Sequence, residues 1–490
     1  MSDTTAPVTL TYTPVEEIEV IRDQVRKGFY SGKLKSIEYR KYQLAQLGYA
    51  IQDNLDKFRD AFKLDLGRNP LETDFMELGT VLKEIKEAHD KVAEWSRSEK
   101  PPFALEFVAM RPVIRKEPKG TVLIIAPFNY PVALSVGPLA GAIAAGNTAV
   151  LKISEQTPAV SALVTEVIHK YLDSDVVRVV NGAVAETTKV LELQWDHILY
   201  TGGERVGRIV AMAAAKHTTP VSLELGGKSP LIVDPKTDLQ TAARRILWGK
   251  GVNAGQTCVA PDYILVPRDS QAKLVEALQA AHAQLWPNPL TSSTFSHLVS
   301  EAAFDRVHSI ISTTTGTVVI GGLPTASKAD KFIPLTVVKD VKGDDSLMRD
   351  ELFGPVLPIV PVDSIEDAVK FVNERPHPLA LYVFSNDQGV KDKVANGTQS
   401  GAICFNETVI HSGVYGLPFG GTGNSGYGYH TGKYSFDMFT HLRASMDQHG
   451  WIDMMIGARF PPYTEQKRAK VASLVFPSLP ARPKGPPGGK

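Results

Sequence analysis

Short apolar strands alternate with helices from Gly120 onward, and this alternation limits the fold more than any other feature of the chain. The runs Thr121–Ala126, Thr148–Lys152 and Val176–Val180 are rich in β-branched residues, and helix-like stretches separate them. Strands that alternate with helices at short spacing predict a parallel sheet covered by helices on both faces. Ligands of such sheets bind beyond the carboxyl ends of the strands, which is where the turns of this chain fall.

Helices precede this region, and a second α/β region follows it from Ser229 to about Ser400. Apolar residues recur at helical spacing in Val15–Tyr30, Ile37–Leu64 and Glu72–Trp95. Residues 103–114 alternate in the manner of a strand, which predicts an arm or a hairpin. The last ten residues, ARPKGPPGGK, predict a disordered tail.

Composition excludes several classes of function. Lys+Arg and Asp+Glu each number 53, so the net charge is zero and there is no basic patch for nucleic acid or an anionic membrane. The two cysteines, Cys258 and Cys404, do not make a disulfide framework and indicate a reducing compartment. No signal peptide and no apolar run of about 20 residues is visible. We therefore expect a soluble cytoplasmic protein of two or three domains.

The two cysteines have different surroundings. Cys404 lies in the apolar run Gly401–Phe405, which is typical of a buried structural cysteine. Cys258 ends the polar turn Asn253–Cys258 directly after a predicted helix. Taken alone, Cys258 fits a nucleophile and a buried structural thiol equally.

Two further polar residues are candidates for chemistry. Glu224 points away from the face of its strand that Leu223 and Leu225 share, and a glycine pair follows. Such a glutamate is either a surface residue or a base in a cleft, and the glycines allow close approach of a ligand. Asn129 lies in a proline-bounded turn after the first strand; it either shapes the turn or donates to a developing oxyanion.

A glycine-rich turn, Gly202–Gly207, joins a strand to a helix. Free N–H groups and the positive helix end make such a turn suitable for a pyrophosphate, although the pattern is not the usual GxGxxG. Lys152 and Glu155, just past the second strand, either bind a ribose or belong to an exposed loop with a helix cap. His411 and His430 have no recognisable catalytic context, and metal-ligand spacing is absent, so no metal site is expected.

Several segments, in order and over about Lys35 to Phe460, resemble the aldehyde dehydrogenase superfamily. They are Ala126–Pro131, Leu151–Glu155, Tyr200–Gly203, Leu223–Pro230, Gly255–Cys258 and Glu351–Pro355. Four more resemble its class-three branch, which covers fatty, aromatic and polyene aldehydes and is usually dimeric: Lys216–Val221, Leu417–Gly426, His430–His441 and Arg459–Thr464. Several motifs in the right order are more specific than any single one.

The resemblance implies an α/β fold with a Rossmann-like cofactor domain, a second α/β catalytic domain and a small β oligomerisation arm. The expected bounds are 1–225 for the N-terminal helices and dinucleotide-binding domain, with the arm near 103–117, and 226–410 for the catalytic domain. Residues 411–476 would form a bridging, oligomerisation and substrate-gating segment, and 477–490 a disordered tail. A homodimer is expected.

The resemblance also implies a mechanism. The thiolate of Cys258 attacks the aldehyde carbon, and a thioester forms after hydride transfer. The amide of Asn129 and the backbone N–H of Cys258 stabilise the oxyanion, each by roughly 3–4 kcal/mol. Glu224 activates the water that hydrolyses the thioester.

The implied cofactor is NAD, with NADP also tolerated by the branch. Its ligands by resemblance are Lys152 and Glu155 at the adenosine ribose, Gly202, Gly203 and Gly207 at the pyrophosphate, Glu351 at the nicotinamide ribose and Phe353 beside the ring. Glu155 would repel a 2′-phosphate, which favours NAD. Glu204 stands where a small hydroxyl residue is common, so it should weaken pyrophosphate binding unless it points away or caps the helix.

The substrate is the least constrained part of the prediction. The aromatic residues Phe128, Tyr130, Tyr415 and Phe419 suggest an apolar tunnel, with Tyr130 and Phe419 as substrate contacts; alternatively these aromatics belong to the core. Fatty, phenylpropanoid and apocarotenoid aldehydes all fit. Long-chain members of the branch often end in a membrane-spanning helix, which residues 477–490 cannot form; Lys467–Phe476 could instead lie on a membrane surface, although a packed or disordered tail is favoured.

Three other functions are alternatives to the predicted aldehyde oxidation. A reductase of acyl phosphates or semialdehydes on the same fold would not need the base Glu224. A non-catalytic binding protein would not need Asn129, Glu224 and Cys258 together. A nucleic-acid or scaffolding protein is disfavoured by the neutral charge.

Overall fold

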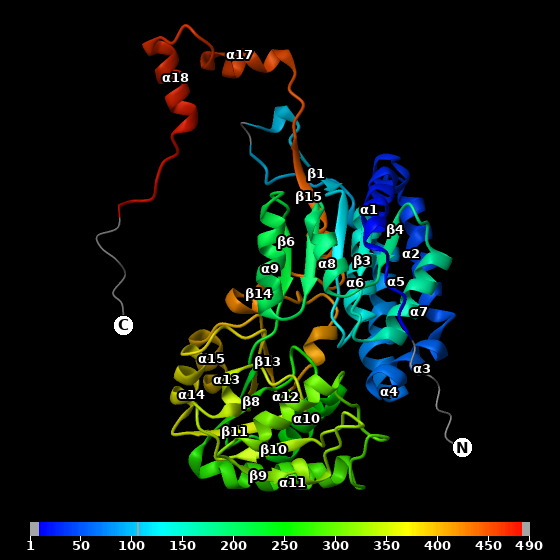
Figure 1. Cartoon of the computed structure of the whole chain (residues 1–490). Helices are drawn as coiled ribbons and strands as arrows, with labels where there is room; N and C mark the ends of the chain where they lie inside the picture. The colour runs from blue at the N-terminus through cyan, green and yellow to red at the C-terminus, as the bar shows by residue number, and fades with distance from the viewer. Residues whose placement is uncertain (1–8, 105–106, 483–490) are drawn as a thin grey trace. The chain divides into compact units, whose positions relative to one another are not determined.

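The computed structural model describes residues 9–104 and 107–482, in which the chain forms two mainly parallel sheets covered by helices (Figure 1). The chain divides into two compact units, Met1–Ser96 with Glu117–His441 and Arg97–Lys116 with Leu442–Lys490. Both sheets lie in the first unit, and they confirm the predicted α/β class. The predicted disordered tail lies outside the described residues from position 483 onward.

Helices form the first part of the chain, as the apolar spacing predicts. They are α1 (Val15–Tyr30), α2 (Ile37–Gln52), α3 (Leu55–Leu66), α4 (Pro70–Thr73), the π-helix η2 (Asp74–Leu78) and α5 (Gly79–Trp95). The run expected over 37–64 is broken at Asn54, whose side chain donates to the carbonyl of Ala50 at 3.0 Å. The run expected over 72–95 contains the π-helix, a feature that often marks functional sites.

The first sheet has the strand order β14–β6–β5–β2–β3–β4. Its strands are β2 (Thr121–Ile125), β3 (Thr148–Lys152), β4 (Val177–Val180), β5 (His197–Thr201), β6 (Val221–Glu224) and β14 (Gly426–Tyr427), and only β14 is antiparallel to its neighbour. The helices α6 (Ala133–Ala145), α7 (Pro158–Tyr171), α8 (Val184–Glu192) and α9 (Glu204–Ala215) connect them. All five residues of β2 are buried, as expected for a parallel strand covered on both faces.

The second sheet has the order β13–β12–β7–β8–β11–β10–β9 and is parallel except for β9. Its strands are β7 (Pro230–Val233), β8 (Tyr263–Pro267), β9 (Thr317–Ile320), β10 (Thr336–Lys339), β11 (Val356–Val362), β12 (Ala380–Phe384) and β13 (Ala402–Phe405). Its helices are α10 (Leu239–Gly251), α11 (Gln271–Leu285), α12 (Glu301–Ser312), α13 (Ser346–Arg349), α14 (Ile365–Asn373) and α15 (Gln388–Gly397). The short helix α16 (Lys433–Met438) is the last helix of the first unit along the chain.

The second unit contains most of the two-stranded sheet of β1 (Val113–Pro118) and β15 (Thr440–Ser445), together with α17 (Asp453–Ile456) and α18 (Glu465–Val475). The strand expected over 103–114 is wrong for most of that range. Residues Val108–Met110 form a 3₁₀ turn and Arg111 is left-handed, with φ 47°, which interrupts an extended strand. Residues 105 and 106 lie outside the described residues.

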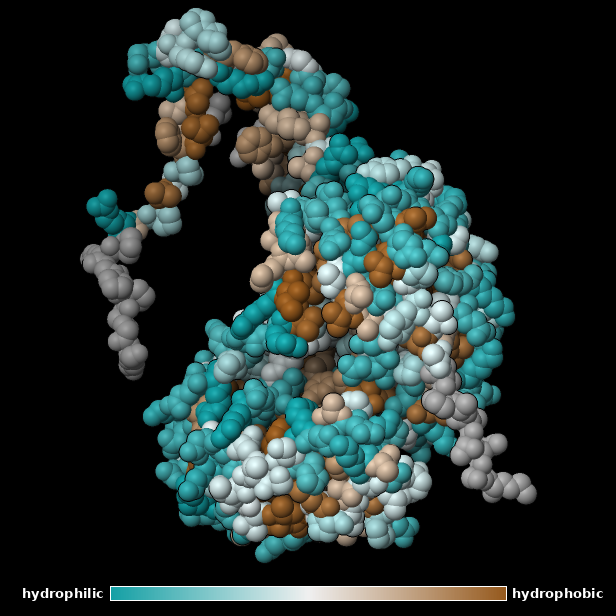
Figure 2. Space-filling model, in the orientation of Figure 1, coloured by the Kyte–Doolittle hydropathy of each residue, from teal (hydrophilic) through white to brown (hydrophobic). Residues whose placement is uncertain are grey.

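Apolar side chains are exposed along this second unit. Figure 2 shows them on the segment from α17 through α18 and onward, and they include Met454, Phe460 and Phe476. In residues 9–104 and 107–482, no helix is long and apolar enough to cross a membrane.

Candidate active site

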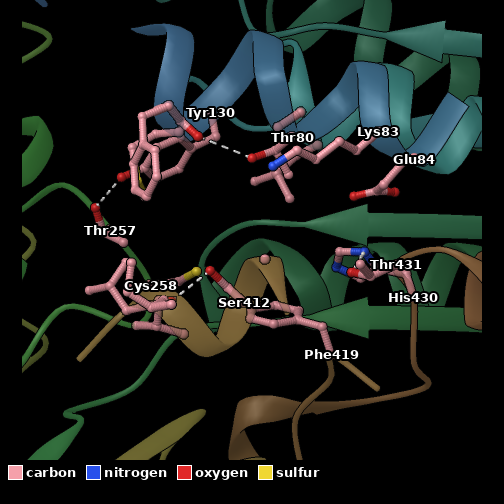
Figure 3. A pocket seen from close by; sticks show the side chains of 18 residues that line it. Thr80, Lys83, Glu84, Tyr130, Thr257, Cys258, Ser412, Phe419, His430 and Thr431 are labelled. Atoms are coloured by element: carbon pink, nitrogen blue, oxygen red, sulfur yellow. Dashed lines mark hydrogen bonds between the residues drawn. The ribbon is translucent and has the colours of Figure 1, made fainter. Parts of the chain in front are cut away.

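A cavity of about 170 Å³ lies in the first unit, and Cys258 is in its wall (Figure 3). Apolar side chains make most of the lining, among them Phe75, Met76, Leu134, Ile410 and Phe419. Figure 3 shows Cys258 and Phe419 on one side and Thr80, Lys83 and Glu84 on the other. The cavity can therefore hold an apolar molecule against the sulfur.

The loop that presents Cys258 is tightly turned. It follows α10 through the 3₁₀ turn η4 (Val252–Gly255), in which Asn253 and Ala254 have φ of 52° and 51°. A Cβ on Gly255, which has φ +71°, would meet the carbonyl oxygen of Gly354 at 2.2 Å, so only glycine fits there. The local sequence thus fixes the direction in which the sulfur faces the cavity.

The Cys258 thiol is neutral in these surroundings. Burial, together with the nearby carboxyl groups of Glu351 and Glu224, raises the pKa of Cys258 to about 12. A thiol becomes nucleophilic only as the thiolate, which a neighbouring positive charge favours. The site therefore needs a cationic ligand or a proton acceptor before Cys258 can react.

Glu224 is the last residue of β6, opposite Thr201 of β5 and Gly426 of β14. It is 2% exposed, and neither carboxyl oxygen has a hydrogen-bond partner among the described residues. Burial raises the pKa of Glu224 well above its ordinary value. A carboxyl group in this state binds a proton readily, which is what a base in a catalytic step must do.

Asn129 is also 2% exposed, and its main chain and side chain have different roles. Its backbone carbonyl accepts hydrogen bonds from Arg68 Nη2 at 2.5 Å and from Asn253 Nδ2 at 3.0 Å. Its side-chain oxygen has no partner in the described part of the chain. The loop is held by its backbone, and these hydrogen bonds do not use the side-chain NH₂, the part of the amide that can donate.

The glycine turn after β5 has the form expected of a phosphate site. Helix α9 begins at Glu204 with Gly203 as its N-cap, and a Cβ on Gly203 would meet nothing within 4 Å. A Cβ on Gly207 would meet Leu225 at 2.8 Å, so glycine here lets the helix pack closely on the sheet. These features fit a dinucleotide pyrophosphate at the N-terminus of α9.

Other expected cofactor residues lie at the same sheet edge or close to Cys258. Lys152 Nζ donates to the carbonyl of Ile153 and to Glu155 at 3.2 Å. Glu351 packs against Gly226, and burial raises the pKa of Glu351 to about 8. The ring of Phe353 lies edge-on to Phe128, with centroids 5.7 Å apart.

Glu204 stands where a small hydroxyl residue is common, and the structure explains why this acid is tolerated. Glu204 forms an ion pair with Arg208 one turn along α9, and Asn424 donates to the same carboxyl oxygen at 3.3 Å. It makes no capping hydrogen bond. The carboxylate is directed along the helix and partly neutralised, so it does not oppose an anion at the glycine turn.

The four aromatic residues expected in a tunnel separate into two pairs. Tyr130 and Phe419 line the cavity. Phe128 packs on Phe353, and Tyr415 is 69% exposed and hydrogen-bonds Glu87. The cavity thus brings together Cys258, Tyr130 and Phe419, while Asn129 is linked to the Cys258 loop through Asn253, which also donates to the carbonyl of Gln256.

Several residues that meet at this site were not predicted from the sequence. Arg68, Glu72 and Glu77 contact the Asn129 and Cys258 loops from the N-terminal helices. His430 lines the cavity and His411 stacks on Phe419 at 6.4 Å; burial lowers the pKa of each to about 4. The one sequence feature that could have pointed to this group is Arg68, a charged residue in the short connection between two predicted helices.

Comparisons with known proteins identify the family of the chain. Residues 4–445 match the family model described as "Aldehyde dehydrogenase family". The chain is 41% identical to "Aldehyde dehydrogenase family 3 comG" of Dictyostelium discoideum over 91% of this chain and 95% of that one. It is 39% identical to "4,4'-diaponeurosporen-aldehyde dehydrogenase" of Staphylococcus aureus, over 89% and 94%.

Solved structures have the same fold. The substrate-bound state of Staphylococcus aureus AldH superposes with a TM-score of 0.90 at 37% identity, covering 93% of this chain and 99% of that one. The Mycobacterium tuberculosis aldehyde dehydrogenase complexed with NAD+ superposes with a TM-score of 0.81 at 27% identity, covering 91% and 94%.

Proposed function

The chain belongs to the aldehyde dehydrogenase family, and from that premise we propose how its own residues perform the NAD(P)-dependent oxidation of an aldehyde to a carboxylic acid. The observation that supports the proposal most directly is the placement of Cys258 in the wall of a largely apolar cavity, with Glu224 near enough to raise its pKa.

Cys258 is the nucleophile. After the thiol has lost its proton to solvent, the thiolate sulfur adds to the aldehyde carbon, and the side-chain amide of Asn129 and the backbone N–H of Cys258 donate to the resulting oxyanion. When bound, the oxidised nicotinamide supplies a hydride acceptor and a positive charge. After oxidation the acyl group remains on Cys258 as a thioester, and Glu224 takes a proton from the water that hydrolyses it.

The proposed cofactor contacts are residues that follow strands of the first sheet or lie close to Cys258. We assign Gly202, Gly203 and Gly207 to the pyrophosphate and Lys152 and Glu155 to the adenosine ribose. Glu351 is assigned to the nicotinamide ribose, with Phe353 beside the ring. The carboxylate of Glu155 would repel a 2′-phosphate, so NAD is favoured over NADP.

The substrate is a hydrophobic aldehyde of the medium- or long-chain, aromatic or polyene kind. Phe75, Met76, Leu134, Ile410 and Phe419 provide the apolar contact area, and Tyr130 and Phe419 are the assigned substrate contacts. The printed name of the Staphylococcus aureus relative, a polyene aldehyde dehydrogenase, supports the polyene class.

Absorbance of NADH tests the proposal. A panel from acetaldehyde through decanal to a conjugated polyene aldehyde is compared on the wild type and on Cys258→Ala. We expect kcat/KM to rise with chain length or conjugation and turnover to fall by at least about 10³-fold in the variant. Turnover that survives in Cys258→Ala contradicts the thioester mechanism. If the wild type oxidises none of the aldehydes, a binding protein is favoured instead.

We further propose a homodimer formed through the second unit. Leu442, Trp451 and Met454 are 61%, 51% and 77% exposed there, and exposed apolar groups of this kind commonly mark a protein interface. Sedimentation should give twice the chain mass for the wild type and one chain mass for Trp451→Glu/Met454→Glu. A monomeric wild type that binds lipid vesicles would favour a peripheral membrane contact instead.

The cytoplasm is the proposed compartment, because both cysteines are unpaired and thiols stay reduced there. Cell fractionation tests this assignment.

A further inference from the structure

We infer that Arg68 is a positioning residue that orients the oxyanion-binding amide of Asn129, acting with Glu72 and Glu77 through the backbone of the Asn129 loop. This inference rests on the proposed role of Asn129 in the reaction. Arg68, Glu72 and Glu77 are called the Arg68 cluster below.

The guanidinium of Arg68 is fully buried and makes two directed contacts. Nη1 donates to Glu77 Oε1 at 3.0 Å and Nη2 donates to the backbone carbonyl of Asn129 at 2.5 Å. Both Arg68 and Glu77 side chains are 0% exposed. A planar guanidinium held at two points has little freedom to turn, so the carbonyl it holds is also fixed.

The two acids of the cluster reach both loops of the active site. Glu77 Oε2 accepts from the backbone N–H of Ala133 at 2.7 Å, at the start of the helix that follows the Asn129 loop. Glu72 Oε1 accepts from the backbone N–H of Asn253 at 2.7 Å, in the turn that leads to Cys258. One segment of the N-terminal helices therefore sets the positions of two loops that are far apart in sequence.

The two loops are also joined beside the cluster. Asn253 Nδ2 donates to the carbonyl of Asn129 and to that of Gln256, each at 3.0 Å. Arg68 lies over the ring of Tyr130, 5.0 Å from its centroid, and the Tyr130 hydroxyl is 2.7 Å from Thr257 Oγ1. These contacts connect Arg68 to the residues that precede the reacting Cys258, without touching the sulfur.

The chemistry of the cluster favours orientation over mere stability. Buried ion pairs contribute little to stability compared with apolar residues of the same shape, because the charges lose their water. Here the backbone of Asn129 is held by two donors, while its side-chain oxygen has no partner in the described part of the chain. The hydrogen bonds that fix the loop use its backbone and not the side-chain NH₂ of Asn129, which is the group that can donate to an oxyanion.

A double-mutant cycle between Arg68 and Asn129 tests the inference. The rate constant of the first turnover, read as the NADH burst, is measured for wild type, Arg68→Met, Asn129→Ala and the double variant. We expect Asn129→Ala to slow the burst by about 10²–10³-fold and Arg68→Met by about 10-fold or more. The double variant should be no more than about 3-fold slower than Asn129→Ala, because an absent amide cannot be misplaced. KM for NAD should stay within about 3-fold of the wild type.

Arg40 provides the matched control. It is also a buried arginine, 7% exposed, and donates to the carbonyls of Leu34 and Ala144, away from the Asn129 loop. Arg40→Met should lower the melting temperature, and any effect on the burst should multiply with that of Asn129→Ala. If Arg68→Met does not fold, Arg68→Lys is used in the same cycle, since one ammonium cannot hold Glu77 and Asn129 as a planar fork does.

The outcomes separate the inference from the proposed function. If Arg68 and Asn129 effects multiply, Arg68 only supports the fold and the inference is overturned while the role of Asn129 stands. If Asn129→Ala itself leaves the burst unchanged, the proposed oxyanion role fails first.

Discussion

Glu77 and Glu224 are buried to nearly the same degree, 0% and 2% exposed, but their oxygens have very different partners. Glu77 accepts from Arg68 with one oxygen and from the backbone of Ala133 with the other. Glu224 has no partner for either oxygen among the described residues. Burial raises the pKa of Glu77 to about 7 against the opposing charge of Arg68, and it raises the pKa of Glu224 with no opposing contact.

The difference separates two uses of a buried acid. A satisfied carboxylate fixes the groups that donate to it, and its removal should be felt as lost geometry and stability. An unsatisfied one is costly to the fold and is retained where a proton must move. The Arg68 cluster belongs to the first kind and the Cys258–Glu224 pair to the second, and the following experiments test that division.

The largest effect is expected for Glu224→Gln. Steady-state kcat should fall by about 10²–10⁴-fold, because an amide cannot take the proton of the hydrolytic water. The NADH burst should persist at nearly one equivalent per active site, and mass spectrometry should find the acyl group on the Cys258 peptide. Normal turnover of the variant, or an equal loss of the burst and of the steady-state rate, would show that Glu224 does not act in the hydrolytic step.

Glu77→Met should lower stability and also slow the burst, because Glu77 belongs to the Arg68 cluster. It leaves the Arg68 cation buried without its closest carboxylate, which typically costs about 3–5 kcal/mol. Urea unfolding measures this loss. Adding Arg68→Met should restore much of the stability, since both charges are then gone, while the burst stays slow. A double variant that regains both stability and burst rate would show that the cluster supports the fold alone.

The pH dependence of stability should distinguish Glu224 from its glutamine variant. The folded protein holds the Glu224 proton more tightly than the unfolded chain does, because burial raises the pKa of Glu224 above 4.5. Its contribution is therefore fully favourable below pH 4.5 and is lost as the pH rises toward the folded-state pKa. Glu224→Gln should gain at least about 2 °C in melting temperature over the wild type between pH 5 and pH 8. A constant difference across that range would contradict the raised pKa.

Much of the fold could be predicted from the sequence. The runs at 121–126 and 148–152 and the helix Val15–Tyr30 follow from apolar spacing, and the structure confirms them. The break in the strand expected over 103–114 could not, since the left-handed φ of Arg111 leaves no trace in an alternating pattern. Local sequence patterns predict burial and turns. Outside glycine and proline, they do not predict the backbone dihedral angle of an individual residue.

The candidate site divides in the same way. Cys258 is a candidate because it ends a polar turn directly after a helix, and Glu224 because it interrupts an apolar strand, but only the family resemblance assigns their roles. Arg68 does not, because its partner Asn129 is 61 positions away, and Asn253 bonds the same carbonyl from 124 positions away. Contacts at such separations depend on how the helices pack on the sheets, which spacing along one segment does not contain.

The smallest effect is expected at the link between the two regions, the Tyr130 hydroxyl 2.7 Å from Thr257 Oγ1. Tyr130→Phe removes one buried hydrogen bond of about 0.5–1.5 kcal/mol, so the burst should slow by roughly 2- to 10-fold. Thr257→Val should do the same, and the double variant should be no slower than either, because both remove the same bond. Tyr171→Phe, which loses only an outer contact to Asp53, serves as the control and should leave the burst unchanged. If the Tyr130 and Thr257 effects multiply instead, each residue acts on Cys258 separately, and the cluster and the reacting pair are not coupled through this bond.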